Sequence, residues 1–255
     1  MRKSIPMILM LLVLTTFSCQ QAKQGESAED TATADSLNGV LDGDSTIYGL
    51  ACDGCTDTIL VFLPLNNIES DPDTFNILNA SRKHRVLGRP TVGERVAVVR
   101  NPNDSTVADY VIVMDDLYGS WCYQVFPTLR QRVETAGMSQ KQLLKVIPDS
   151  IKEALKVSRE YGMQLSGNHE ARPIGAYRPN EKIDEEDPIE YPSVKRYREW
   201  RLYNGKLLLT EKGIDSTGNQ RIVSIDTAEF LLMGKDTLVL SINKELRSFY
   251  RKKNE

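Results

Sequence analysis

Three cysteines in the body of this chain have the side chains best suited to redox or metal chemistry. Cys52 and Cys55 are separated by Asp53-Gly54, and Cys122 follows much later. Outside the cytoplasm such a pair tends to oxidise, so we expect a Cys52–Cys55 disulfide first. The loop that it would close is very short, and the chain-entropy stabilisation of a disulfide grows with loop length. The bond would therefore either fix the Asp53-Gly54 turn or serve as a redox sensor.

A metal site is the other chemistry open to these thiols. Cu(I) is a soft ion that accepts three thiolates, so Cys52, Cys55 and Cys122 could bind it if the fold brings Cys122 to the pair. A four-cysteine zinc site lacks a ligand. A thioredoxin-like catalyst needs the pair at the start of a helix, whereas strand-like segments flank this one. The alternative for Cys122 is a small buried hydrophobic residue in a strand. We expect no other cofactor.

Enzymatic chemistry has little support elsewhere. The chain has 2 histidines, His84 and His169, which argues against a histidine-based triad. Asp115-Asp116 are adjacent, and a strand would point them to opposite faces. Ser120 has no identifiable base. We therefore expect a protein that is not an enzyme. The net charge of −3 leaves no broad basic field, which argues against nucleic-acid binding.

The amino terminus has the layout of an export signal. Arg2 and Lys3 precede an apolar run over residues 5–14. That run is shorter than the ~20 residues that a membrane-spanning helix needs. The following Thr16-Phe17-Ser18-Cys19 resembles the lipobox of bacterial lipoproteins, although Phe17 stands where a small residue is commoner. The resemblance implies removal of residues 1–18 and attachment of fatty acyl chains to Cys19; the alternative is ordinary secretion with a free Cys19.

Lipid attachment would place the protein in the cell envelope, with the membrane as one partner. Gln20-Gln21 follow the cysteine, where an aspartate retains enterobacterial lipoproteins at the inner membrane. By that analogy the outer membrane is favoured over the inner one, and the side of the membrane stays open. Residues 19–44 are polar and small, so they cannot bury enough surface to fold, and we expect a disordered tether.

Residues 45–116 read as a small β domain. Apolar runs bounded by turn residues predict five short strands, at 46–52, 58–63, 74–78, 95–100 and 110–114. Five short strands without a helix pattern favour a small OB-like barrel, with an open meander sheet as the alternative.

Residues 117–255 combine strands with an insertion at about 125–195. Within it, residues 139–163 show a helical pattern, and a loop rich in Gly, Pro, Asn and acidic residues follows. Strands resume at Glu199, and Asn204-Gly205 is a strong signal for a two-residue hairpin turn. The predicted fold class is thus mainly β with a helical insertion.

The carboxy-terminal part resembles the lipocalin-like domains of Bacteroidota lipoproteins. The resemblance is carried by Gly119-Ser120-Trp121 and by segments 200–209, 236–240 and 249–252. It implies an antiparallel barrel that opens with this glycine and tryptophan and whose interior can hold an apolar ligand. Trp121 would fill the floor of a narrow barrel or contact the ligand, and Trp200 has the same two interpretations.

A second, shorter resemblance lies in the amino-terminal half. Tyr48-Gly49-Leu50-Ala51-Cys52-Asp53-Gly54-Cys55, followed by the apolar run at 58–63, is similar to the Cys-x-x-Cys strand of the NlpE outer-membrane lipoprotein family. That family is linked to copper and envelope stress, so the resemblance implies a redox or metal-sensing role for the pair.

Three functions follow from these observations. The leading hypothesis is an envelope lipoprotein that binds a small apolar ligand or another envelope protein through its lipocalin-like barrel. The second is an envelope sensor in which Cys52 and Cys55 respond to metal or redox state. The third is a structural or adhesive surface lipoprotein.

Overall fold

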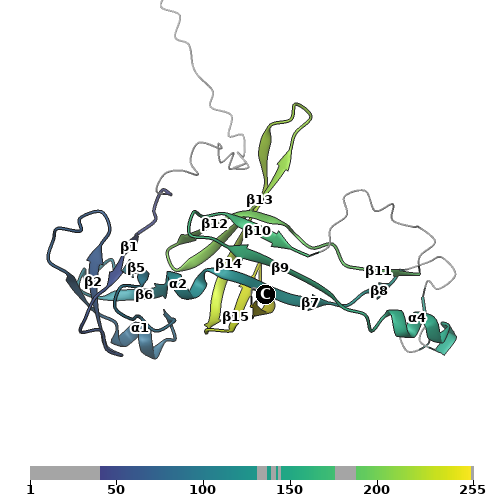
Figure 1. The fold of residues 1–255 in the computed structure, drawn as a ribbon, viewed down its shortest axis with the longest axis horizontal. Coiled ribbons are helices and arrows are strands. Elements are labelled where there is room, and N and C mark those ends of the chain that lie inside the picture. Colours follow the sequence, from purple (N-terminus) through teal and green to yellow (C-terminus); the bar gives the residue numbers. More distant parts are fainter. Residues whose placement is uncertain (1–40, 131–136, 139–141, 143–144, 176–187, 254–255) are drawn as a thin grey trace, which may run out of the picture. The chain divides into compact units, whose positions relative to one another are not determined.

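The computed structural model describes residues 41–130, 137–138, 142, 145–175 and 188–253 (Figure 1). The described residues all belong to one compact unit. The predicted signal peptide, the candidate acylation site Cys19 and the tether up to residue 40 lie outside the described residues. Among the described helices, none is both long and apolar enough to span a membrane.

The amino-terminal half forms a six-stranded sheet in the order β3-β2-β1-β5-β6-β4. Its apolar runs are ended by turns rich in Gly, Pro, Asn and Asp, as the sequence predicts. The strands are β1 (Thr46–Ala51), β2 (Ile59–Pro64), β3 (Asp73–Asn76), β4 (Val86–Leu87), β5 (Arg95–Arg100) and β6 (Ala108–Val113).

This sheet curls into a partly closed barrel. A parallel bridge between Asn76 and Val107 joins the end of β3 to the start of β6. Asn76 N also donates to Thr106 O at 2.8 Å. The strands β1, β2, β3, β6 and β5 thereby form a ring in which β1 pairs with both β2 and β5. The expected small β sheet is confirmed, and its OB-like character stays a prediction.

Two short helices in this half were not expected. They are α1 (Leu78–Arg82) and α2 (Met114–Leu117). Neither is long enough to show the apolar repeat by which a helix is recognised in a sequence, so the prediction of strands alone was wrong here.

The carboxy-terminal half forms an eight-stranded antiparallel sheet in the order β10-β9-β7-β16-β15-β14-β13-β12. Alternating buried and exposed residues, clearest in β15, give these strands one face toward the core. The strands are β7 (Gly119–Val125), β9 (Arg159–Leu165), β10 (Ala171–Ile174), β12 (Tyr197–Tyr203), β13 (Lys206–Ile214), β14 (Gln220–Met233), β15 (Thr237–Ile242) and β16 (Glu245–Lys252).

The sheet closes nearly completely into a barrel. Its two edge strands, β10 and β12, approach each other through a bridge between Glu170 and Glu199. Beside it, Trp200 N donates to His169 O at 2.9 Å. A mainly β fold with an antiparallel barrel is therefore confirmed.

The expected insertion at about 125–195 needs correction, because β9 and β10 lie inside it and belong to the barrel. Residues 159–163 form the start of β9, not a helix, since Met163 and Leu165 alternate into the core. Gly162 lets β9 pack tightly on β7, where an added Cβ would lie 2.0 Å from Trp121 O. Of the predicted helical segment, α4 (Asp149–Ala154) is helical. A two-stranded ladder pairs β8 (Thr128–Leu129) with β11 (Ile189–Glu190).

The main hydrophobic core crosses the domain boundary expected at residues 116 and 117. One cluster of buried residues fills the barrel and also includes Leu87, Ala97 and Ile112 of the small sheet. The hairpin turn of β12 and β13, predicted at Asn204-Gly205, docks there: Ser45 N donates to Asn204 Oδ1 at 2.9 Å. A second cluster, around Phe62, fills the small sheet alone.

Candidate functional site

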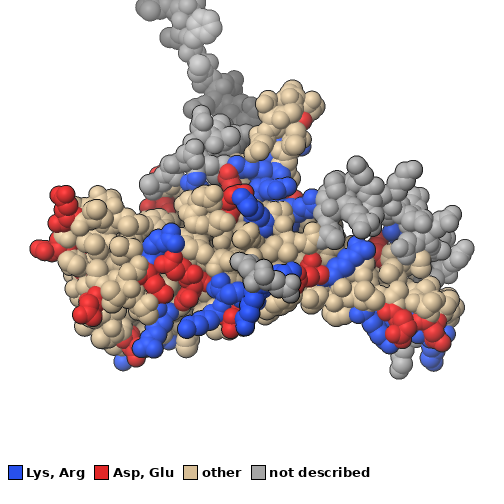
Figure 2. Space-filling view, in the orientation of Figure 1, with Lys and Arg blue, Asp and Glu red and all other residues tan. Residues whose placement is uncertain are grey.

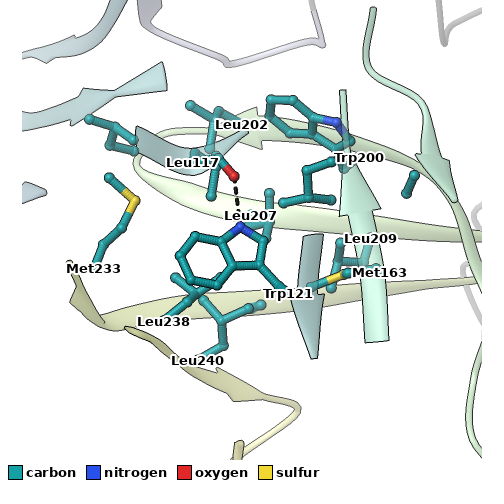
Figure 3. Packing of buried hydrophobic residues seen from close by; sticks show 14 of the residues in the cluster. Leu117, Trp121, Met163, Trp200, Leu202, Leu207, Leu209, Met233, Leu238 and Leu240 are labelled. Carbon is teal, nitrogen blue, oxygen red and sulfur yellow. Dashed lines mark hydrogen bonds between the residues drawn. The ribbon is translucent and has the colours of Figure 1, made fainter. Parts of the chain in front are cut away.

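One end of the barrel, here called the floor, is sealed where α2 leads into β7. Trp121 of β7 is completely buried, and its Nε1 donates to Leu117 O of α2 at 2.8 Å (Figure 3). The indole therefore has its one polar group satisfied inside the protein. Gly119 precedes it with a φ of 131°, which a residue with a side chain rarely adopts.

Arg251 of β16 completes the floor. Its guanidinium carbon lies 4.1 Å from the centre of the Trp121 ring, a cation–π contact. The same guanidinium donates to Tyr118 O at 2.5 Å and to the carbonyl oxygens of Asp116 and Lys235. One side chain thus ties α2, the β14–β15 turn and β7 together.

Side chains fill the barrel above the floor. Trp200 is also completely buried, and its Nε1 donates to Ser166 O at 3.0 Å. Its ring contacts Tyr118 and His169 edge-on or tilted. Figure 3 shows both tryptophans surrounded by apolar side chains, which include Leu117, Met163, Leu202, Leu207, Leu209, Met233, Leu238 and Leu240. The structure therefore places Trp121 and Trp200 in the packed core.

The far end of the barrel, where β7 ends and β16 begins, is lined differently. Arg247 Nη1 donates to Tyr123 Oη at 3.0 Å, and its guanidinium carbon lies 4.8 Å from the centre of that ring. Tyr123 also packs edge-on against Phe249 of the core at 5.2 Å between ring centres. Burial raises the pKa of Tyr123 and outweighs the opposing effect of the Arg247 charge. Tyr123, Arg247 and Tyr161 are only half-buried.

Asp226 is the buried acid of this far end, with 4% of its surface exposed. It accepts hydrogen bonds from Tyr197 Oη at 2.6 Å, Lys195 Nζ at 2.7 Å and Asn243 Nδ2 at 2.8 Å. Burial by itself raises the pKa of Asp226, but these donors outweigh it and leave the pKa below its ordinary value of 3.8. The far end thus offers aromatic rings, an arginine and a fixed carboxylate around an apolar core.

Residues 188–253 match a family model described as Lipocalin-like. The matched segment holds β12 to β16, and with them Trp200, Asp226, Arg247 and Arg251. The expected lipocalin-like character of the carboxy-terminal region is confirmed to that extent.

Comparison with solved structures found a lipocalin-like protein from Bacteroides thetaiotaomicron VPI-5482. It is 17% identical, covers 54% of this chain and 97% of its own, and has a TM-score of 0.27. A TM-score at this level adds no argument about function. No curated protein matches the chain.

The cysteine pair lies in the turn that connects β1 and β2. Both are free thiols in the structure, and a disulfide between them stays a prediction. Cys55 Sγ lies 3.2 Å from Cys52 O and receives a hydrogen bond from Val61 N at 3.4 Å. Backbone hydrogen bonds from Cys52 N to Val61 O and from Thr56 N to Ile59 O, both at 2.8 Å, hold the turn together with the Cys55 thiol.

The three-thiolate copper site does not assemble. Cys122 lies in β7 of the barrel sheet, fully buried, opposite Tyr250 of β16. Within the described part of the chain, no group of three or more His, Cys, Asp and Glu side chains is placed to hold a metal ion. Burial raises the pKa of Cys122 to about 11, with the Glu160 carboxylate as a second cause. Cys122 is therefore a core thiol, as in its alternative interpretation.

The far-end residues were not singled out from the sequence. Tyr123, Asp226 and Arg247 come from three separate strands, and only the barrel brings them together. Arg251 lies within segment 249–252 of the lipocalin-like resemblance, but no role was assigned to it from the sequence. Asp226 stands as a single aspartate in the sequence of β14. An aspartate at such a position is common in exposed strands, so it did not indicate a buried acid.

Proposed function

We propose that this chain is a non-enzymatic, lipid-anchored protein of the cell envelope whose lipocalin-like barrel binds a small apolar ligand at its far end. The observation that carries the proposal is the asymmetry of the barrel. Trp121 and Arg251 seal one end, whereas half-buried aromatic and charged side chains line the other. Binding sites of small ligands combine apolar and aromatic surface with a few fixed polar groups.

The packed interior restricts the positions in the barrel that such a ligand could occupy. Trp121 and Trp200 occupy the lower part of the barrel, so the proposal places the ligand above them, against Tyr123, Tyr161 and Phe249. Arg247 would then meet a polar group of the ligand, because its guanidinium already lies at the rim beside Tyr123. A mainly apolar ligand with one polar end fits this arrangement.

The anchor is part of the proposal through the lipobox-like sequence before Cys19. A tethered barrel of this kind would handle its ligand close to a membrane, where apolar molecules concentrate. On the face drawn in Figure 2, basic and acidic side chains are interspersed with uncharged ones. This pattern suits a soluble body held beside a membrane better than one that binds a polyanion.

The test is a titration of the mature protein with a fluorescent fatty acid analogue. Arg247→Ala should weaken binding about tenfold, because a charged hydrogen bond contributes about 1.5 kcal/mol. Arg221→Ala, which removes an exposed arginine of the same β-sheet, is the matched control and should change nothing. If wild-type protein fails to bind any apolar probe, or if Arg247→Ala binds as tightly as the control, the barrel is not the binding site.

A sensor role for Cys52 and Cys55 is the second candidate. It is favoured by the position of both thiols in one turn, free and only partly buried. Thiol counting on protein taken from its native envelope would show whether the pair cycles between reduced and oxidised forms. If Cys52→Ser leaves the cellular response to metal or oxidant intact, the sensor role is wrong.

A further inference from the structure

A cavity of about 400 Å³ lies outside the barrel, against the small sheet. Its apolar surface comes from two elements that are far apart in the sequence. Ile77, Val86 and Leu87 belong to the small sheet and the segment around α1, whereas Leu231, Leu232 and Met233 end β14. A cavity of this volume can hold a small organic molecule.

The end of β14 is irregular at this cavity. The register with β15 shifts between Phe230 and Leu232, which marks a β-bulge. In a regular strand neighbouring side chains alternate between faces, yet Leu231 and Leu232 are 50% and 52% exposed. The bulge therefore turns two adjacent leucines outward. Bulges that redirect side chains in this way are common next to binding sites.

The polar rim of the cavity carries an unmatched cation. Arg89 stands between Gly88 and Pro90, and no ion pair of Arg89 occurs among the described residues. His84 also lines the cavity, and its φ of 55° is that of the left-handed residue that ends α1, because His84 N donates to Ser81 O and Arg85 N to Ala80 O. Asp57 is the acidic residue of the lining, and it would oppose an anion.

We propose that this cavity binds a medium-chain carboxylate, with its alkyl chain against Leu231 and Leu232 and its carboxylate on Arg89. Arginine holds a carboxylate through two parallel hydrogen bonds, and His84 can donate a third. The site is separate from the barrel, so this proposal goes beyond the function proposed above and does not depend on it.

Three molecules of equal chain length and different charge test the proposal. Decanoate, decanol and decyltrimethylammonium are titrated by calorimetry into the mature full-length chain. Decanoate should bind best, and decyltrimethylammonium should bind at least about tenfold more weakly, because only the carboxylate pairs with Arg89. Equal binding of all three would overturn the proposal, since it would leave Arg89 without a role.

Single substitutions then locate the site. Arg89→Ala should weaken decanoate binding about tenfold, and Asp57→Asn should strengthen it, because that change removes a like charge. A purely structural role for these exposed residues predicts neither change. Arg221→Ala is the matched control for Arg89.

The apolar wall is tested with Leu232→Asp, which should abolish decanoate binding. Leu246→Asp is its control, because Leu246 is 71% exposed and lies on β16 outside the cavity. Leu231→Asn gives a second variant of the wall should Leu232→Asp lower the melting temperature. If both wall variants bind like the control, the cavity is not the site.

Cys55 gives an independent readout, because it is one of the residues that line the same cavity. Decanoate should slow alkylation of Cys55 in a Cys52→Ser background, and Arg89→Ala should remove this protection. Arg247→Ala separates the two proposals. If it abolishes decanoate binding and Arg89→Ala does not, decanoate occupies the barrel, and the cavity proposal is wrong while the barrel proposal stands.

Discussion

Arg251 is the residue on which the sealed end of the barrel depends most. It covers Trp121 and donates to the carbonyl groups of Asp116 in α2, of Tyr118 directly after α2 and of Lys235 in the β14–β15 turn. Truncation leaves the part-buried carbonyls of Asp116 and Tyr118 without this donor, and each unsatisfied buried group costs about 1–3 kcal/mol. We predict that Arg251→Ala lowers the free energy of unfolding by about 3 kcal/mol or more, and that Arg251→Lys loses less. Urea denaturation measures both, with Arg221→Ala as the control; an unfolding midpoint unchanged in Arg251→Ala would contradict the assigned role.

The contribution of Asp226 to the free energy of unfolding should depend on pH. Its pKa in the folded protein is lowered below 3.8, so its stabilising contribution is complete above that value and is lost as the pH falls through the folded pKa. Asp226→Asn cannot ionise, so the difference in unfolding free energy between wild type and variant should shrink from pH ~6 to pH ~2.5. Chemical denaturation across that range checks it. A difference that stays constant would show that the carboxylate charge is not what stabilises the far end.

The cysteines should differ in reactivity. Burial raises the pKa of the Cys122 thiol to about 11, and the thiolate is the nucleophile. We predict that iodoacetamide modifies Cys52 and Cys55 in the folded protein, whereas Cys122 reacts only after unfolding. Mass spectrometry of the labelled peptides reads the result directly. Fast labelling of Cys122 under native conditions would place it outside the core.

At the scale of single elements, the turn between β12 and β13 ties the barrel to the small sheet. Gly205 has a φ of 81°, and a Cβ there would lie 2.6 Å from the Tyr110 ring. Gly218 has a φ of 88° with nothing within 4 Å, so it is a matched control. We predict that Gly218→Ala costs about 1 kcal/mol from strain, and that Gly205→Ala costs about 2 kcal/mol more from the clash. Equal melting temperatures for the two variants would mean that the turn does not pack on Tyr110.

Elements with a strong local signal could be predicted from the sequence. The apolar runs of β1, β2 and β5 and the Asn204-Gly205 turn appear where they were expected, because short-range patterns determine them. The strand β9 was missed, because its alternation is weak and helix-forming residues precede it. Its place depends on pairing with β7, a contact that no local pattern contains.

The candidate sites could be predicted only in part. The sequence left two interpretations of Trp121 and Trp200, as core residues or as ligand contacts. In the structure both are buried in the packed core. The far-end group and the cavity beside β14 combine residues from distant strands, so only the fold reveals them. The bulge at Phe230 is invisible in a sequence that reads as a continuous apolar strand.

At the scale of the whole described unit, the barrel and the small sheet share a core. Leu87, Ala97 and Ile112 pack in the same cluster as Trp121, so the two halves stabilise each other. An independent unfolding of either half is therefore not expected, and a single cooperative transition should be seen by calorimetry. Two separate transitions would show that the shared cluster contributes little.

We propose a barrel that is sealed at one end and binds an apolar ligand at the other. Native mass spectrometry of the protein extracted from its own envelope tests this most directly. We predict a chain that begins at an acylated Cys19 and carries a small noncovalent ligand, which Arg247→Ala loses and Arg221→Ala keeps. A ligand-free wild-type protein, or an Arg247→Ala variant that retains the same bound mass, would contradict it.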